Sequence, residues 1–236
     1  MEEYGFVGGR LEEVLSRVDG AARRSGRDPR EIRILAVTKF HPLAAVQAAY
    51  DAGIRVFGEN RVQEALEKYP EFLRLHPDAA VHMIGHLQGN KVKKAVDLFR
   101  CVQSADSTDL LGELDRRAAA AGRTVDVLLE LHTGEESKSG FPDRNAALEA
   151  CGRLPALRNL RLRGLMTMAP YTDDVPAIRA SFRSLRSLFE EIAGTRSFPA
   201  FDTLSMGMSN DFEIAVEEGT TLLRLGTVLF GRRDPG

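Results

Sequence analysis

Lys39 is the residue whose position points most directly to chemistry. It lies two residues beyond the apolar segment 32–37 (IRILAV), which predicts a buried strand. Burial of a lysine amine favours its neutral form, and a neutral amine can form an imine with a carbonyl compound. The competing interpretation is an ordinary strand-end lysine with its amine in water. On Lys39 alone, that second interpretation is the better one.

A glycine- and serine-containing segment near the C-terminus could bind phosphate. Ser205, Gly207 and Ser209 follow a predicted strand, and Asn210 and Glu213 have the capping-box spacing that predicts the start of a helix. Glycine allows close approach of the backbone to a ligand, and a helix N-terminus favours anions. A plain turn followed by a helix cap would explain the same residues.

A second segment of the same kind follows the last predicted strand. Gly226 and Thr227 again combine a glycine with a hydroxyl, and Arg224 interrupts the otherwise apolar strand just before them. Arg224 either forms a structural ion pair or presents a cation to a ligand. Together, the two segments make a phosphate site as good an interpretation as two plain turns.

Other polar residues at predicted strand ends remain ambiguous. Asn60 has capping-box spacing with Gln63, so a helix cap is as good an interpretation as a binding residue. His82 and His86 have a spacing that brings two metal ligands together on a helix, but they flank a strand end and no third ligand is evident. We therefore expect no metal site. Lys138, in the polar segment 135–140, is a poorer imine candidate than Lys39, and its segment could be a lid.

The elements that must position these residues alternate between short strands and helices. The predicted strands are 32–37, 55–57, 81–84, 100–103, 125–131, 162–166, 202–205 and 221–225. The predicted helices are 9–24, 43–52, 61–68, 90–97, 108–121, 144–152, 174–193 and 210–218. Eight such units predict a single (β/α)8 TIM barrel with an extra N-terminal helix, which would cover the gap left where the last helix is missing. An open doubly wound sheet is the alternative, although no GxGxxG follows the first strand.

Length and composition agree with one domain over 1–236. The 236 residues suit one barrel, and 43% hydrophobic residues suffice for a core. A net charge of −2 gives no field that would attract nucleic acid or an anionic membrane. Cys101 and Cys151 have no metal-ligand spacing, and the first residues lack signal-peptide features. We expect a cytoplasmic protein, by default a monomer.

Six segments, in this order, resemble the YggS/PROSC family of pyridoxal 5′-phosphate (PLP) homeostasis proteins. They are AVTKFHP, FGENRVQE, HMIGHLQGNK, EESKSGF, RGLMTMAP and LSMGMSNDFEIAVEEGTTLLRLGTVLFG. The resemblance implies a barrel similar to the N-terminal domain of alanine racemases. Val81 and Gly89 depart from the family pattern, where tryptophan and serine are frequent, and they leave the third loop less certain.

The resemblance also implies a role for each candidate. Lys39 would hold PLP as a Schiff base, Arg224 would face the pyridine nitrogen, and Asn60 and His82 would line the pocket. The phosphate would be bound by five residues: Ser205, Gly207, Ser209, Gly226 and Thr227.

Three functions remain open at this point. The first is a PLP-binding protein that buffers or delivers the cofactor, with PLP-dependent apoenzymes as possible partners and no strong turnover. A cation beside the pyridine nitrogen weakens the electron sink that PLP enzymes use, and we see no tyrosine placed opposite Lys39. The alternatives are a PLP-dependent amino-acid racemase and an aldolase-type barrel in which Lys39 forms an imine with a sugar phosphate.

Overall fold

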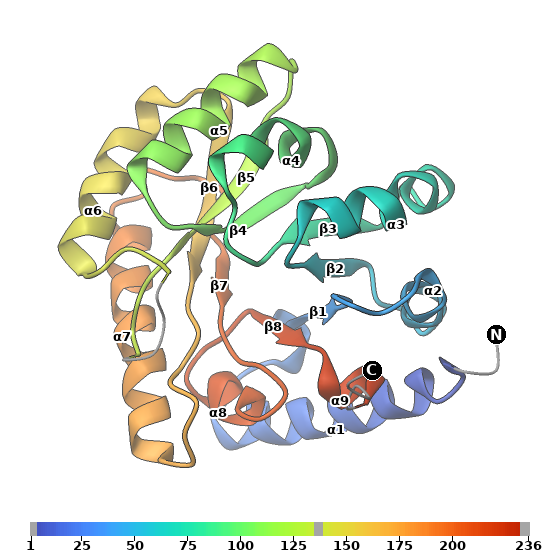
Figure 1. The fold of residues 1–236 in the computed structure, drawn as a ribbon. Coiled ribbons are helices and arrows are strands. Elements are labelled where there is room, and N and C mark those ends of the chain that lie inside the picture. Colours follow the sequence, from blue (N-terminus) through green and yellow to red (C-terminus); the bar gives the residue numbers. More distant parts are fainter. Residues whose placement is uncertain (1–3, 135–138, 232–236) are drawn as a thin grey trace.

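The protein is a closed barrel of eight parallel strands, each followed by a helix (Figure 1). This computed structural model describes residues 4–134 and 139–231. The strands are β1 (Arg33–Val37), β2 (Val56–Glu59), β3 (Ala80–Met83), β4 (Cys101–Ala105), β5 (Val125–Glu130), β6 (Leu160–Met166), β7 (Thr203–Ser205) and β8 (Leu222–Leu225). They pair in sequence order, and β8 pairs with β1. The predicted barrel is confirmed, and closure excludes the open sheet.

The helices form the outer layer around the strands (Figure 1). They are α1 (Val7–Arg24), α2 (Leu43–Asp51), α3 (Val62–Leu75), α4 (Val92–Leu98), α5 (Thr108–Ala120), α6 (Arg144–Arg153), α7 (Val175–Gly194), α8 (Phe212–Glu217) and α9 (Thr227–Phe230). Three short 3-10 helices are η2 (Pro29–Glu31), η3 (Gly89–Lys91) and η4 (Leu154–Ala156). Within the described residues, no helix combines the length and apolar character that crossing a membrane requires.

The N-terminal helix α1 completes the outer layer next to β8, as the sequence predicts. Its buried residues Val7, Leu11, Val14, Val18 and Ala21 recur every three or four positions and so share one face of the helix. That face packs against α8, α9 and α2 (Figure 1). Because α9 has only four residues, α1 supplies the cover that a full-length last helix would give.

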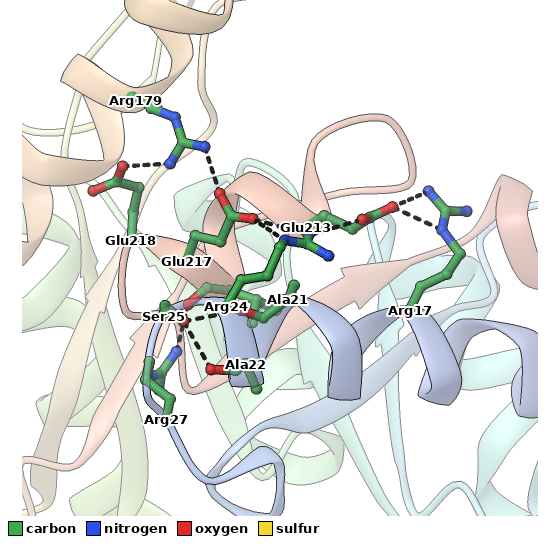
Figure 2. Close-up of polar contacts among 11 residues, drawn as sticks. Arg17, Ala21, Ala22, Arg24, Ser25, Arg27, Arg179, Glu213, Glu217 and Glu218 are labelled. Carbon is green, nitrogen blue, oxygen red and sulfur yellow. Dashed lines mark hydrogen bonds and ion pairs between the residues drawn. The ribbon is translucent and has the colours of Figure 1, made fainter.

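Glutamate side chains of α8 form ion pairs with arginines of both α1 and α7 (Figure 2). Arg17 contacts Glu213 at 2.6 Å, and Arg24 contacts Glu213 and Glu217 at 3.2 and 2.9 Å. Arg179 of α7 pairs with the same Glu217. Exposed ion pairs of this kind stabilise a fold only slightly, so we assign to them the placement of α1 rather than a large share of the stability.

Helix α3 is longer than predicted, because Pro70 does not end it. The aromatic side chains of Tyr69 and Phe72 pack against Phe57 of β2 beneath the helix. Pro70 itself lies on the exposed face, where water can hydrate the carbonyl that the missing N–H leaves unpaired. Tertiary packing therefore carries the helix through a residue that normally stops one.

The barrel interior contains a small apolar core and a buried polar layer. Cys101, Leu128 and Met166 form the apolar cluster. Gln103 of β4 and Ser205 of β7 are fully buried, and the Ser205 hydroxyl donates to Gln103 Oε1 at 2.7 Å. These two strands are not neighbours in the sheet, so the hydrogen bond crosses the interior.

Candidate functional site

A cavity of about 580 Å³ opens at the C-terminal ends of β1, β7 and β8. Its walls include Lys39, Ser209, Arg224, Gly226 and Thr227, five of the nine residues predicted from the sequence. Binding sites of (β/α)8 barrels lie at this end of the strands. The volume is within the roughly 300–1,000 Å³ that is usual for small-ligand sites.

Lys39 lies in a tight turn at the end of β1. The strand ends at Val37, and the amide of His41 donates to the carbonyl of Thr38 at 3.0 Å. Phe40 has a φ of 63°, which is uncommon for a bulky side chain and costs conformational energy. A turn of this kind requires support from its surroundings, and Lys39 occupies its centre, half-buried at the cavity wall.

Polar side chains of β2 and α3 give that support through Thr38, the residue before Lys39. The Thr38 hydroxyl donates to Glu59 Oε1 at 2.7 Å and lies 2.6 Å from the Tyr69 hydroxyl. Lys68 Nζ donates to the Thr38 carbonyl at 2.9 Å and to Glu59 Oε1 at 2.8 Å.

The residue after Lys39 is held as well. Glu64 accepts a hydrogen bond from the amide of Phe40, and Lys68 Nζ donates to Glu64 Oε1 at 3.0 Å. The backbone is thus fixed on both sides of Lys39 by neighbouring residues of one cluster. We call Glu59, Glu64, Lys68 and Tyr69 the turn clamp.

The turn clamp is an ionisable cluster in a dry environment. Burial raises the pKa of Glu59, and the hydrogen bond from Lys68 opposes that rise. Burial also raises the pKa of Tyr69 well above its ordinary value, so Tyr69 remains protonated. Among the described residues, Glu59 Oε2 has no hydrogen-bond partner. A buried polar atom without a partner is costly, so the cluster gives up some stability at this position.

The sequence pattern does not predict the turn clamp, because Glu59 lies beyond the end of the predicted strand. One usable signal was present. Glu64 and Lys68 are four residues apart, so they meet on one helical face. Nothing in that spacing shows that the pair points toward β1.

Arg224 brings a positive charge to the cavity. Its side chain is only 4% exposed, Nη1 donates to Ser205 Oγ at 2.8 Å and Nη2 to the carbonyl of Thr167 at 2.7 Å. Burial lowers the pKa of Arg224 to about 10, while Asp211 and Glu130 act in the opposite direction. The guanidinium therefore stays charged at neutral pH, and two hydrogen bonds fix its orientation.

The loops after β7 and β8 meet at the cavity. Ser209 Oγ accepts a hydrogen bond from the amide of Val228 at 3.2 Å, which ties the first loop to α9. Thr227, the first residue of α9, is exposed at the cavity wall. A half-buried amine, a fixed guanidinium and two hydroxyls in one cavity suit a phosphorylated carbonyl compound.

The predicted helix caps after β7 and β2 are wrong. The helix after β7 begins at Phe212 with Asp211 at the N-cap, and Asp211 Oδ1 accepts from the amide of Met208 at 2.5 Å. The helix after β2 begins at Val62, and Asn60 does not cap it. The helix after β7 thus starts two residues later than predicted, and the helix after β2 starts one residue later.

Four predicted site residues do not line the cavity. Gly207 has a φ of 95°, and a Cβ there would lie 2.5 Å from that of Ala215, so the backbone itself requires glycine. The Ser205 hydroxyl is hydrogen-bonded to Arg224 and Gln103. Asn60 lies at the end of β2, and its backbone is so close to Gly85 that a Cβ on Gly85 would lie 2.8 Å from the Asn60 carbonyl oxygen.

His82 is the fourth, and it faces the opposite end of the barrel. It lines a cavity of about 140 Å³ together with Arg33, Cys101, Asp126 and other residues near the N-terminal ends of the strands. Burial lowers the pKa of His82 to about 4, so it is neutral at physiological pH. His86 lies apart from it and contacts Asp106 at 2.9 Å.

Tyr171 is an unexpected residue on the cavity wall. It is 82% exposed and lies in the loop after β6. Nothing in the local sequence pattern predicts this placement. Lys138 and the rest of segment 135–138 lie outside the described residues.

Comparison with known proteins gives a consistent result. Residues 11–234 match the family described as "Alanine racemase, N-terminal domain". The chain is 40% identical over 225 residues to a pyridoxal phosphate homeostasis protein of Aquifex aeolicus, covering 95% of this chain and 97% of that protein. A crystal structure of an unknown protein from Bifidobacterium adolescentis is 34% identical, with a TM-score of 0.90 over 95% of this chain and 94% of that one.

Two further structures help to separate fold from function. PipY of Synechococcus elongatus PCC7942, solved with PLP bound, is 38% identical, with a TM-score of 0.79 over 95% of this chain and all of that one. An alanine racemase of Clostridium difficile is 13% identical with a TM-score of 0.73, so it shows the fold alone. That comparison covers 94% of this chain but only 57% of the racemase chain.

Proposed function

The chain belongs to the family of pyridoxal phosphate homeostasis proteins, and from that premise we propose that it binds PLP in the cavity at the C-terminal end of the barrel. It holds the cofactor and buffers or delivers it in vitamin B6 and amino-acid homeostasis. The observation that carries this proposal is the meeting of Lys39, Arg224, Ser209 and Thr227 in one cavity of about 580 Å³.

Lys39 supplies the amine that attaches the cofactor's aldehyde as a Schiff base. PLP provides the reactive aldehyde and the ring that withdraws electrons, and the protein provides position. The turn clamp supports this role, since it fixes Thr38 and Phe40 on either side of Lys39. A positioned amine reacts faster than a mobile one because less orientational freedom is lost.

Arg224 and the two loops complete the proposed site. Arg224 faces the pyridine nitrogen, where its charge disfavours protonation of the ring. Ser209, Gly226 and Thr227 bind the phosphate through hydroxyl and backbone donors. Ser205 takes a different role from the one predicted, because its hydroxyl is already bonded to Arg224 and Gln103. We retain Asn60, His82 and Gly207 only as residues that support the site from outside the cavity.

The same features favour a carrier over an enzyme. An unprotonated pyridine ring is a weak electron sink, which suits storage and release better than turnover. We propose a single-domain, monomeric, cytoplasmic protein whose partners are PLP and PLP-dependent apoenzymes.

Borohydride reduction tests the proposal directly. Protein loaded with PLP is reduced, digested and mapped by mass spectrometry, and the pyridoxyl group is expected on the peptide that contains Thr38 and Lys39. Label mainly on Lys91 or Lys138 would contradict the assignment. A visible absorbance band in the loaded protein also separates PLP from a sugar phosphate, which gives no such band.

An amino-acid racemase remains the second candidate, because of Tyr171. A racemase needs a proton donor and acceptor on both faces of the substrate, and Tyr171 brings a hydroxyl to the cavity wall. Its ring is largely exposed, which is a poor setting for a positioned catalytic group. Exchange of the α-proton of alanine in deuterated water measures this activity. Slow exchange that is unchanged in Tyr171→Phe supports the carrier, and fast exchange lost in that variant supports the racemase.

A further inference from the structure

A chain of side-chain hydrogen bonds crosses the barrel between its two cavities. We call the cavity at the C-terminal ends of the strands the upper cavity, and the one near their N-terminal ends the lower cavity. Arg224 Nη1 lies 2.8 Å from Ser205 Oγ, Ser205 Oγ lies 2.7 Å from Gln103 Oε1, and Gln103 Nε2 lies 2.9 Å from His82 Nδ1. Arg224 lines the cavity of about 580 Å³, and His82 and Gln103 line the cavity of about 140 Å³. We call these four side chains the interior relay.

The hydrogen bonds of the interior relay are all donated in the same direction, from Arg224 toward His82. A guanidinium can only donate, so Ser205 Oγ accepts from Arg224. The Ser205 hydroxyl proton then goes to Gln103 Oε1, which leaves the Gln103 amide nitrogen to donate to His82 Nδ1. His82 must therefore be neutral, with its proton on Nε2. The pKa of His82, about 4, agrees with a neutral ring.

Three side chains of the interior relay are buried, and His82 is partly exposed at the lower cavity. Gln103 and Ser205 have no exposed surface, and Arg224 is 4% exposed. Water cannot replace a missing partner at such positions, and a buried polar group that loses its partner carries the full cost of desolvation. The adjoining Cys101, Leu128 and Met166 show that this barrel also fills interior space with apolar side chains. A polar chain in this position therefore requires a reason.

We propose that Gln103 and His82 are positioning residues for Arg224: through Ser205, they fix the direction in which the guanidinium faces the upper cavity. The consequence for the cofactor ring rests on the proposed function, since it needs PLP to lie against Arg224. The proposed orientation of the Arg224 guanidinium does not depend on PLP binding.

The first experiment is made on the protein without PLP, by 15N NMR of the Arg224 guanidinium. Held by Ser205 and by the Thr167 carbonyl, Arg224 should give separate signals for its two Nη groups in the wild type. In Ser205→Ala, rotation about the Nε–Cζ bond should be about tenfold faster, the change that corresponds to about 1.4 kcal/mol. Gln103→Leu and His82→Leu should show smaller changes in the same direction.

Two control variants make this test specific. His82→Asn keeps an acceptor near the position of Nδ1 and should restore the wild-type signals that His82→Leu loses. Cys101→Ser changes a residue of the same lower cavity that belongs to no link of the relay, and it should leave Arg224 unchanged. Signals that change in Ser205→Ala but in neither Gln103→Leu nor His82→Leu would overturn the proposal. If Gln103→Leu does not fold, the comparison of His82→Leu with His82→Asn decides whether the proposal holds.

The second experiment uses protein loaded with PLP labelled with 15N in its ring. The ring-nitrogen shift should move in Arg224→Lys and, by less, in Gln103→Leu, while His82→Asn matches the wild type. A shift that moves in Arg224→Lys but stays fixed in Gln103→Leu would overturn the relay. If the wild type fails to bind PLP, the proposed function fails, and the first experiment still decides on the relay.

Discussion

The two mouths of the barrel are both lined by charged side chains, yet they are built differently. At the upper mouth, the buried Arg224 has no carboxylate within 4.0 Å among the described residues, and it faces a cavity of about 580 Å³. At the lower mouth, Asp126 contacts Arg161 at 2.6 Å, Arg163 at 3.4 Å and Arg100 at 3.8 Å around a cavity of about 140 Å³.

The comparison shows how one scaffold separates binding from stability. The charge of Arg224, which has no carboxylate close to it among the described residues, remains available for a ligand, and two hydrogen bonds hold its guanidinium in place. At the lower mouth, Asp126 of β5 offsets part of the charge of the surrounding arginines and links β5 to Arg161 and Arg163 of β6. We therefore expect changes at the upper mouth to affect PLP binding and changes to the ion pairs of the lower mouth to affect the free energy of unfolding.

The largest effect is expected for Lys39→Ala at the upper mouth. Without the amine, no Schiff base forms, so the visible band and the borohydride-reducible label should both disappear. PLP should still bind weakly through the phosphate loops, and urea unfolding should change little because Lys39 is only half-buried. Lys93→Ala, on the exposed face of α4, is the control and should retain the band. A full band in Lys39→Ala would rule out the assignment.

Asp126→Asn should have the largest effect at the lower mouth. It removes a buried carboxylate that contacts partly exposed arginines, and the loss of hydrogen bonds between charged groups costs about 2 kcal/mol. Urea unfolding should show that loss, with PLP affinity unchanged within experimental error. Asp202→Asn removes a more exposed partner of Arg163 and should cost less. Loss of PLP affinity without loss of stability in Asp126→Asn would break the comparison.

The pH dependence of stability should also depend on the lower mouth. Burial lowers the pKa of His82 from 6.5 to about 4, so between these values the unfolded chain binds more protons than the folded protein. The free energy of unfolding should fall as the pH drops through this window, by at most about 3 kcal/mol at about 1.4 kcal/mol per pH unit. In His82→Asn the slope should flatten, whereas His76→Asn should retain it. Equal slopes in the wild type and His82→Asn would contradict this account.

A smaller effect is expected for Thr227→Val. Loss of one hydroxyl that donates to the phosphate should weaken PLP binding by about 1.5–3 kcal/mol, the usual value for a hydrogen bond to a charged group. Pyridoxal, which has no phosphate, should bind weakly to the wild type and equally weakly to the variant. Thr172→Val changes another threonine of the cavity wall and serves as the control. A Thr227→Val protein that binds PLP like the wild type would remove Thr227 from the phosphate site.

The sequence by itself determined the barrel and the positions of its polar strand ends. Apolar strands alternate with amphipathic helices, and this pattern is local, so it can be read without knowledge of the contacts. Lys39, Ser209, Arg224, Gly226 and Thr227 were found in the same way, because each follows or interrupts a recognisable strand. The fold then brings the C-terminal ends of β1, β7 and β8 to one cavity.

Only the tertiary structure decided which partner each buried side chain meets. The Ser205 hydroxyl bonds to Gln103 from a strand 102 residues away, His82 faces the lower cavity, and Lys68 reaches back to the Thr38 carbonyl. Such partners depend on the register and closure of the whole sheet, which fix the direction of every side chain inside the barrel. No local pattern contains that information, because the energy of a buried polar group is set by neighbours that are distant in the sequence.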